Sequence, residues 1–322
     1  SNPSIAYLML QNDFYLQVLI MAHCVGHSDF FKNNRMFKDT DPDNIVTRMR
    51  NAKKRIQSYI EDPNIGQEKV EDFLDSLHAI NFQTNRYNMP RISKEQIKKE
   101  EIDHGGKKFK DWQLDVLEIV KEDSLYFMPQ MQTKILNEGW ASFWHFKILH
   151  ELNLPDELHL PFLKMHNAVV RPHIGGVNPY HVGFYIFQKI EKEFGLEKCF
   201  EVRALHDDVS AIRLFLNEED FRELNFFSYT NHKDGSASVS EVADTDDWKV
   251  VRDDLIKRTG INSIPHIYVD SISKDGTLIL KHEHDGRDLD LDYADNVMRH
   301  VKNIWCDDVK LFTIIEEEIW EI

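Results

Sequence analysis

The hydrophobic pattern of this chain changes near Phe200, and that change limits which folds the chain can adopt. Before Phe200, apolar residues recur every three or four positions, as they do in amphipathic helices. After it, short runs of β-branched and aromatic residues are separated by two helical stretches. A length of 322 residues suits about two domains. We therefore predict an α+β protein, with a mainly α-helical domain over residues 1–200 followed by a small α+β domain over residues 201–322.

Helical periodicity predicts several separate helices in the first of these domains. Their expected ranges are Ser4 to about Phe31, a helix capped by Asp43, Val70–Ile80, Pro129–His150 and Pro179–Phe194. Pro129 is expected to open its helix because the fixed φ angle of proline suits a first helical turn.

The periodicity is lost between about residues 83 and 110. Pro90, a run of Lys and Glu from Lys94 to Glu101, and the pair Gly105–Gly106 leave little apolar surface to bury. We therefore predict a flexible linker inside the helical domain, exposed and weakly ordered over about Asn85–Lys107.

The second domain contains five predicted strands and two predicted helices. The strands are expected at 224–229, 236–242, 265–271, 277–284 and 309–315, and the helices at 247–258 and 293–305. Asp275–Gly276 lies between the third and fourth runs and is typical of a β-hairpin. The order of these elements favours an antiparallel sheet.

Charge and cysteine content exclude some classes of function. The chain has 39 Lys+Arg against 55 Asp+Glu, and a net charge of -16 repels phosphate backbones, so we expect no nucleic-acid partner. The three cysteines form no C-x-x-C pair, which fits a reducing compartment, and the start of the chain lacks the basic residues of a signal peptide. No apolar run reaches the ~20 residues of a membrane span. We expect a cytoplasmic protein.

Two histidines and one glutamate form the strongest candidate site. His23 and His27 lie four residues apart in a predicted helix, so they share one face about 6 Å apart along the axis. Glu138, between Leu136 and Trp140 on another predicted helix, would be costly to bury without a positive partner. Two histidines and a carboxylate are the ligands of many catalytic zinc sites. We predict zinc bound by these three residues; the alternative is a pair of helix histidines bonded to backbone or carboxylate groups.

The candidate site lacks one part of the familiar zinc-peptidase pattern. In H-E-x-x-H, a glutamate that acts as general base follows the first histidine, whereas Cys24 stands at that position here. A thiol is a poor proton shuttle, and Cys24 points about 100° away from His23 on the helix. Either another residue supplies the base, or the site is not that of a peptidase.

Other polar residues are weaker candidates, each with a structural alternative. His145 lies two turns, about 10.5 Å, beyond Glu138, too far to share its ion. We interpret it as a catalytic candidate that orients a metal ligand or lies beside the substrate, or else as a histidine at the edge of the core. Tyr180 is a catalytic candidate that would donate a hydrogen bond to an oxyanion, or it is part of an ordinary helix start. Further candidates for orienting a ligand or closing the pocket are Asp29, Asn33, Asn167, His173, Asn178 and His181.

A charged cluster follows the fourth predicted strand. Its members are Lys281, His282, His284, Asp285, Arg287, Asp288 and Asp290. The cluster is either an interaction edge or a solvated face, and the alternating signs favour the solvated face.

Several stretches spread along the chain are similar to one known family. They are Asn2–Leu8, Ala22–Asn34, Tyr126–Gln130, Thr133–Ala141, Val177–Tyr180, Leu280–His282 and Gly286–Leu291. On these stretches the chain resembles the SpoVR (stage V sporulation protein R) family of bacteria. The resemblance implies a link with the spore cortex peptidoglycan, although the family also occurs in bacteria that do not sporulate and its members are usually longer at the amino end. A Glu followed by Gly-Trp-Ala, as at Glu138, also resembles the third-ligand motif of Glu-zincins and implies a zincin-like helical domain.

Two functions from different classes follow. One is a zinc-dependent hydrolase of amide or peptide bonds, with peptidoglycan or its precursors as the substrate that the resemblance implies. The other is a non-catalytic regulatory or interaction protein with a structural or vestigial metal site, whose C-terminal sheet docks partners such as the serine kinases often encoded near this family. Metal analysis of the purified protein distinguishes the two.

Overall fold

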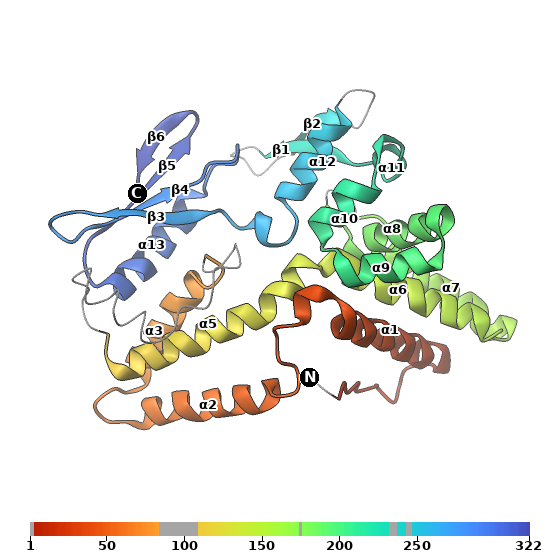
Figure 1. Ribbon diagram of the computed structural model, residues 1–322, viewed down its shortest axis with the longest axis horizontal. Helices are drawn as coiled ribbons and strands as arrows, with labels where there is room; N and C mark the ends of the chain where they lie inside the picture. The colour runs from red at the N-terminus through yellow and green to blue at the C-terminus, as the bar shows by residue number, and fades with distance from the viewer. Residues whose placement is uncertain (1–2, 84–108, 174–175, 232–236, 243–246) are drawn as a thin grey trace. The chain divides into compact units, whose positions relative to one another are not determined.

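The computed structural model describes residues 3–83, 109–173, 176–231, 237–242 and 247–322 (Figure 1). The chain forms two compact units, one of residues 1–43 and 129–263 and the other of residues 44–128 and 264–322. The expected boundary near residue 200 follows secondary-structure content, whereas these units follow contacts in space, so that boundary stays a prediction. The predicted linker at about 83–110 lies almost entirely outside the described residues.

The first unit is mainly helical. Its helices are α1 (Phe14–Asn33), η1 (Arg35–Phe37), the end of α5 (Asp111–Gln132), α6 (Lys134–Glu151), α7 (Asp156–Val170), α8 (Pro179–Phe194), α9 (Leu196–Leu205), α10 (Asp208–Phe215), α11 (Glu218–Glu223), α12 (Trp248–Lys257) and η2 (Gly260–Ser263). Strands β1 (Phe227–Asn231) and β2 (Ala237–Val242) form an antiparallel pair of their own. The core surrounds α6, which packs against both α1 and α8.

The second unit combines helices with a four-stranded sheet (Figure 1). Its elements are α2 (Ile45–Glu61), α3 (Gln67–Ala79), most of α5, β3 (Ile267–Ile272), β4 (Leu278–His282), α13 (Leu291–Trp305), β5 (Val309–Ile315) and β6 (Glu318–Glu321). The strand order is β3-β4-β5-β6. Helix α13 packs against α3 and β5, and its residues join those of the sheet in one apolar cluster.

The prediction of an antiparallel sheet is wrong, because the sheet is mixed. Strands β3 and β4 pair antiparallel, as do β5 and β6, but β4 and β5 pair parallel. Helix α13 connects β4 to β5 as a crossover, and such a connection returns the chain in the same direction. From β1 on, the order of strands and helices was predicted correctly except for β6, which adds an edge strand after β5. Helices α10 and α11 lie before β1, where no helix was predicted. The zincin-like character of the helical part stays a prediction.

Two helix starts differ from the expectations. Helix α1 begins at Phe14 rather than near Ser4, because the Asp13 carbonyl accepts the first hydrogen bonds of the helix, from Leu16 and Gln17. Pro129 lies inside α5 and does not open α6, which begins at Lys134. Helix α8 spans Pro179–Phe194, as predicted.

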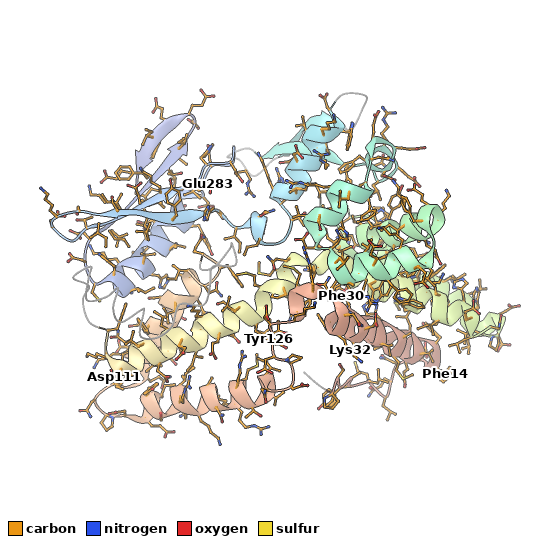
Figure 2. All side chains as sticks on the ribbon, viewed as in Figure 1. Phe14, Phe30, Lys32, Asp111, Tyr126 and Glu283 are labelled. Atoms are coloured by element: carbon orange, nitrogen blue, oxygen red, sulfur yellow. The ribbon has the colours of Figure 1, made fainter. Side chains whose placement is uncertain are left out.

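Side chains of α1 anchor the helix in the first unit (Figure 2). Phe30, near its carboxyl end, is fully buried in the main core, whereas Phe14 at the opposite end is exposed. Leu19 and Ala22 pack into a second cluster with Leu149 and Phe162. No helix among the described residues is both long and apolar enough to cross a membrane.

Three small residues allow helices α1, α6 and α8 to approach with their backbones in contact. A Cβ atom on Gly139 would lie 2.2 Å from the carbonyl carbon of Gly183, and one on Gly183 would lie 2.0 Å from the carbonyl oxygen of Ile135. A Cβ atom on Gly26 would lie 2.7 Å from the Cα atom of Ala141. No side chain fits at these crossings without moving a helix.

Gly183→Ala tests this packing. Alanine normally stabilises a helix interior by about 1 kcal/mol relative to glycine, but here the added methyl group meets backbone and should lower the free energy of unfolding by about 1–3 kcal/mol. Gly176→Ala is the control, because nothing lies within 4 Å of its added Cβ atom. Urea denaturation of both variants measures the difference, and equal stability would contradict the backbone contact.

Candidate metal centre

One turn of α1, from His23 to His27, places two imidazole rings side by side on the same face of the helix. The helix is continuous through Gly26, so the two side chains share one face, as their spacing predicted. Their Nε2 atoms lie 3.0 Å apart, and their ring centroids lie 4.5 Å apart. The two nitrogens are close enough to share an ion.

Glu138 on α6 faces both histidines. Its Oε2 atom lies 3.6 Å from Nε2 of His23 and 3.3 Å from Nε2 of His27. A tetrahedral zinc ion with ligand bonds of about 2.0–2.1 Å separates its ligand atoms by about 3.3 Å. Nε2 of His23, Nε2 of His27 and Oε2 of Glu138 form a triangle whose sides of 3.0, 3.3 and 3.6 Å lie on either side of that value. The three donor atoms therefore fit one ion of zinc size.

The electrostatics of the triangle also suit a cation. Oε2 of Glu138 is buried, and no described residue donates a hydrogen bond to it. Burial would raise the pKa of Glu138, but the facing His23 and His27 outweigh burial and lower that pKa to about 2. Burial lowers the pKa of His27, but the neighbouring Glu138 and the hydrogen bond to Asn137 outweigh burial and raise that pKa. An anionic carboxylate without a donor is a natural ligand for a metal ion.

Asn137 determines which nitrogen of His27 faces this triangle. Its Oδ1 atom lies 2.9 Å from Nδ1 of His27, so Nδ1–H donates to the amide oxygen and Nε2 keeps its lone pair for an ion. Sequence analysis did not single out Asn137. It could have been found, because a ligand histidine needs an acceptor for its second ring nitrogen and Asn137 precedes Glu138.

His145 lies behind His23 and is not one of the three candidate ligands. Its Nδ1 atom is 3.1 Å from Nδ1 of His23, and its Nε2 atom is 2.7 Å from Nδ1 of His166 on α7. Burial, together with His166, His23 and His27, lowers the pKa of His145 to about 2, so its ring is neutral. Burial and the nearby His150 lower the pKa of His166 to about 4. His166 is a second residue that sequence analysis missed.

Tyr180 reaches the triangle from the first turn of α8. Its ring stacks on that of His23 with centroids 6.0 Å apart, and the charge of Glu138 acts on its hydroxyl group. Burial, followed by the Glu138 charge, raises the pKa of Tyr180 to about 12, so the hydroxyl keeps its proton at neutral pH. Asn178 caps the helix by accepting from the Tyr180 amide at 3.0 Å, so the structural alternative holds for Asn178.

A cavity of about 600 Å³ opens beside these residues. Its lining residues are Leu19, His23, Lys134, Glu138, His145, Val169, His173, Asn178, Pro179 and Tyr180. The structure therefore brings six predicted candidates to one cavity: His23, Glu138, His145, His173, Asn178 and Tyr180. His27 completes the triangle from the same turn of α1.

The remaining candidates lie elsewhere. Asp29 accepts hydrogen bonds from the Trp140 indole and from Asn33, and it pairs with Arg203 at 3.1 Å, so it fixes helices rather than a ligand histidine. Asn167 is exposed. Cys24 is half-buried. Burial lowers the pKa of His181, which does not line the cavity.

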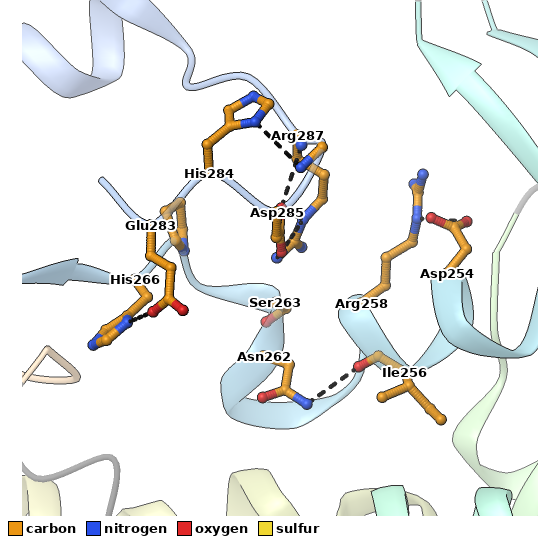
Figure 3. A network of polar contacts seen from close by, with 12 residues as sticks. Asp254, Ile256, Arg258, Asn262, Ser263, His266, Glu283, His284, Asp285 and Arg287 are labelled. Atoms are coloured by element: carbon orange, nitrogen blue, oxygen red, sulfur yellow. Dashed lines mark hydrogen bonds and ion pairs between the residues drawn. The ribbon is translucent and has the colours of Figure 1, made fainter. Parts of the chain in front are cut away.

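The charged cluster of the second unit is paired locally (Figure 3). Asp285 and Arg287 form an ion pair of 2.5 Å, and His266 pairs with Glu283. Outside the close-up, Lys281 pairs with Asp270 at 2.7 Å. These pairs favour the interpretation as a solvated face.

Comparisons with known proteins agree with the resemblance found in the sequence. A family model described as "SpoVR like protein" matches residues 1–108 and 102–264, and one described as "SpoVR-like C-terminal domain" matches residues 265–316. The "Uncharacterized protein YcgB" of Escherichia coli (strain K12) is 30% identical to the chain, and the alignment covers 97% of this chain and 76% of that protein. No solved structure matches the chain.

Glu138→Gln tests the proposed ligand set. The change keeps the shape of the side chain but removes the charge, so zinc affinity should fall by about 100-fold or more, beyond the 10–100-fold typical of residues that only support a ligand. Competition with a chromophoric chelator measures this affinity. Glu157→Gln, an exposed carboxylate on α7, is the control and should bind zinc as the wild type does. Equal affinity in the two variants would remove Glu138 from the ligand set.

Proposed function

The chain belongs to the SpoVR family, and from that premise and the geometry of the candidate centre we propose that it is a zinc-dependent hydrolase of amide or peptide bonds. One observation carries the proposal: three ligand atoms of His23, His27 and Glu138 lie 3.0–3.6 Å apart at a cavity large enough for a substrate. Three protein ligands leave a coordination position open, as catalytic zinc sites require.

Bound zinc would polarise a substrate carbonyl group and lower the pKa of a water molecule. The residues around the site would orient the ligands and donate a hydrogen bond to the substrate. Asn137 keeps His27 in the tautomer that binds the ion. Tyr180 keeps its proton at neutral pH and lines the cavity, so it is suited to donate a hydrogen bond to the oxyanion that develops on the substrate.

A proton acceptor is still required. Among the described residues that line the cavity, Glu138 is the only carboxylate, and it serves as a ligand. His145 has both ring nitrogens in contact with other histidines. His173 also lines the cavity, and an imidazole ring nitrogen can accept a proton from water. We assign the role of general base to His173, in place of the glutamate that Cys24 replaces.

The cavity also suggests the kind of substrate. Lys134 lies four residues before Glu138 on α6, so it shares a helix face with the ligand, and it lines the same cavity. Its ammonium group would pair with a carboxylate of a peptide substrate. The peptides of peptidoglycan carry such carboxylates, in keeping with the family's link to the spore cortex.

One observation favours the alternative of a non-catalytic, regulatory protein. The described lining of the cavity contains no second carboxylate beside Glu138, whereas zinc peptidases use one as general base. In that alternative the ion stabilises the packing of α1 on α6, and a protein such as a serine kinase docks on the C-terminal sheet.

Hydrolysis of a muramoyl peptide by the zinc-loaded protein distinguishes the two functions. We expect release of free amine that stops when a chelator removes zinc and returns when zinc is restored. Tyr180→Phe should lower kcat by about 100-fold, as loss of one oxyanion donor does, while zinc affinity is kept. Zinc binding without turnover, and without any shift in the visible spectrum of the cobalt-substituted protein on adding a hydroxamate, would establish the regulatory alternative instead.

A further inference from the structure

Two buried histidines behind His23 take no part in the proposed reaction. His145 on α6 is fully buried, and His166 on α7 is 2% exposed. The ring of His166 lies among aromatic side chains, with centroids 4.7 Å from Phe146 and 4.9 Å from Phe184. Burying two imidazoles in apolar surroundings is costly unless their nitrogens are hydrogen-bonded, so their arrangement calls for an explanation.

The three rings form a continuous chain of nitrogen contacts. Nδ1 of His23 lies 3.1 Å from Nδ1 of His145, and Nε2 of His145 lies 2.7 Å from Nδ1 of His166. A neutral imidazole has one N–H donor and one acceptor nitrogen, so each contact needs one ring to donate and the other to accept.

The protonation state of Nε2 of His23 determines which ring donates in each hydrogen bond between His23, His145 and His166. When Nε2 of His23 offers its lone pair to an ion, Nδ1 carries the proton and donates to Nδ1 of His145. His145 must then carry its own proton on Nε2 and donate to Nδ1 of His166. Two sets of tautomers satisfy both contacts, running in opposite directions, and only this set turns the lone pair of His23 toward Glu138 and His27.

We propose that His145 and His166 form a histidine relay that fixes the tautomer and orientation of His23 and strengthens it as a metal ligand. The inference rests on the proposed metal site and adds His166 to it as a positioning residue, although His166 touches neither the ion nor the cavity. Asn137 gives His27 the same kind of support through a single amide oxygen. Each ligand histidine thus has its own acceptor.

Three variants test the relay. His166→Leu removes the acceptor and should weaken zinc binding by about 10–100-fold, the usual effect of losing a partner of a ligand histidine. His166→Asn places an amide oxygen close to the position of Nδ1 and should restore most of that affinity. His150→Leu is the matched control, because His150 contacts the same Phe146 ring but bonds to a backbone carbonyl outside the relay, and it should bind zinc normally.

Zinc affinity and the melting temperature of the metal-free protein are measured for each variant. A merely structural role for His166 would lower the melting temperature and leave zinc affinity unchanged, which would overturn the relay. Wild-type protein that binds no zinc would instead overturn the proposed site itself. The two failures are therefore distinguishable.

A second measurement needs no variant. Long-range ¹H–¹⁵N spectra of the zinc-bound wild type report which nitrogen of each imidazole carries the proton. We expect Nδ1–H in His23 and Nε2–H in both His145 and His166. A proton on Nδ1 of His145 would belong to the opposite set of tautomers and overturn the proposal, even if His166→Leu fails to fold.

Discussion

The close backbone contact of α1 and α8 with α6 is the constraint on which the candidate centre depends. Gly26 directly precedes His27, and Gly139 directly follows Glu138. At both positions a Cβ atom would collide with backbone of the neighbouring helix, and Gly183 of α8 meets Gly139 in the same way. Metal–ligand distances tolerate about 0.2 Å of error, so ligands from two helices need such a rigid crossing. The glycines therefore determine the spacing of the site as well as the packing of the core.

A second, remote interaction fixes where α6 begins. Asp208, at the start of α10, accepts the backbone N–H groups of Ile135 and Leu136, each at 2.9 Å. Burial raises the pKa of Asp208 to about 8, although the two amide donors oppose that rise. These donors belong to the first turn of α6, the turn before Glu138, where a helix has unpaired N–H groups that favour an acceptor. The side chain of Asp208, far away in the sequence, thus aligns the helix that carries Glu138, the proposed third ligand.

These two interactions explain what sequence could and could not predict. Helix α8 was located correctly because its signals are local: Asn178 and Pro179 at its start and Gly195 at its end. The start of α6 was misplaced at Pro129 because the acceptor for the backbone N–H groups of its first turn is Asp208, which no local pattern connects to it. The parallel pairing of β4 and β5 was missed for the same reason, since strand direction depends on how the α13 crossover packs and not on the composition of either strand.

In the candidate site, too, some features depend on local sequence and others depend on contacts between helices. Two histidines four residues apart on a helix offer four ring nitrogens, and their spacing alone indicates that two of these can share an ion. Spacing does not identify the acceptors for the other two nitrogens. Those acceptors are Asn137 and His145 on α6, and His145 depends in turn on His166 of α7. The cluster of candidate ligands could therefore be predicted from sequence, whereas the groups that would hold them in a metal-binding tautomer follow only from the packing of three helices.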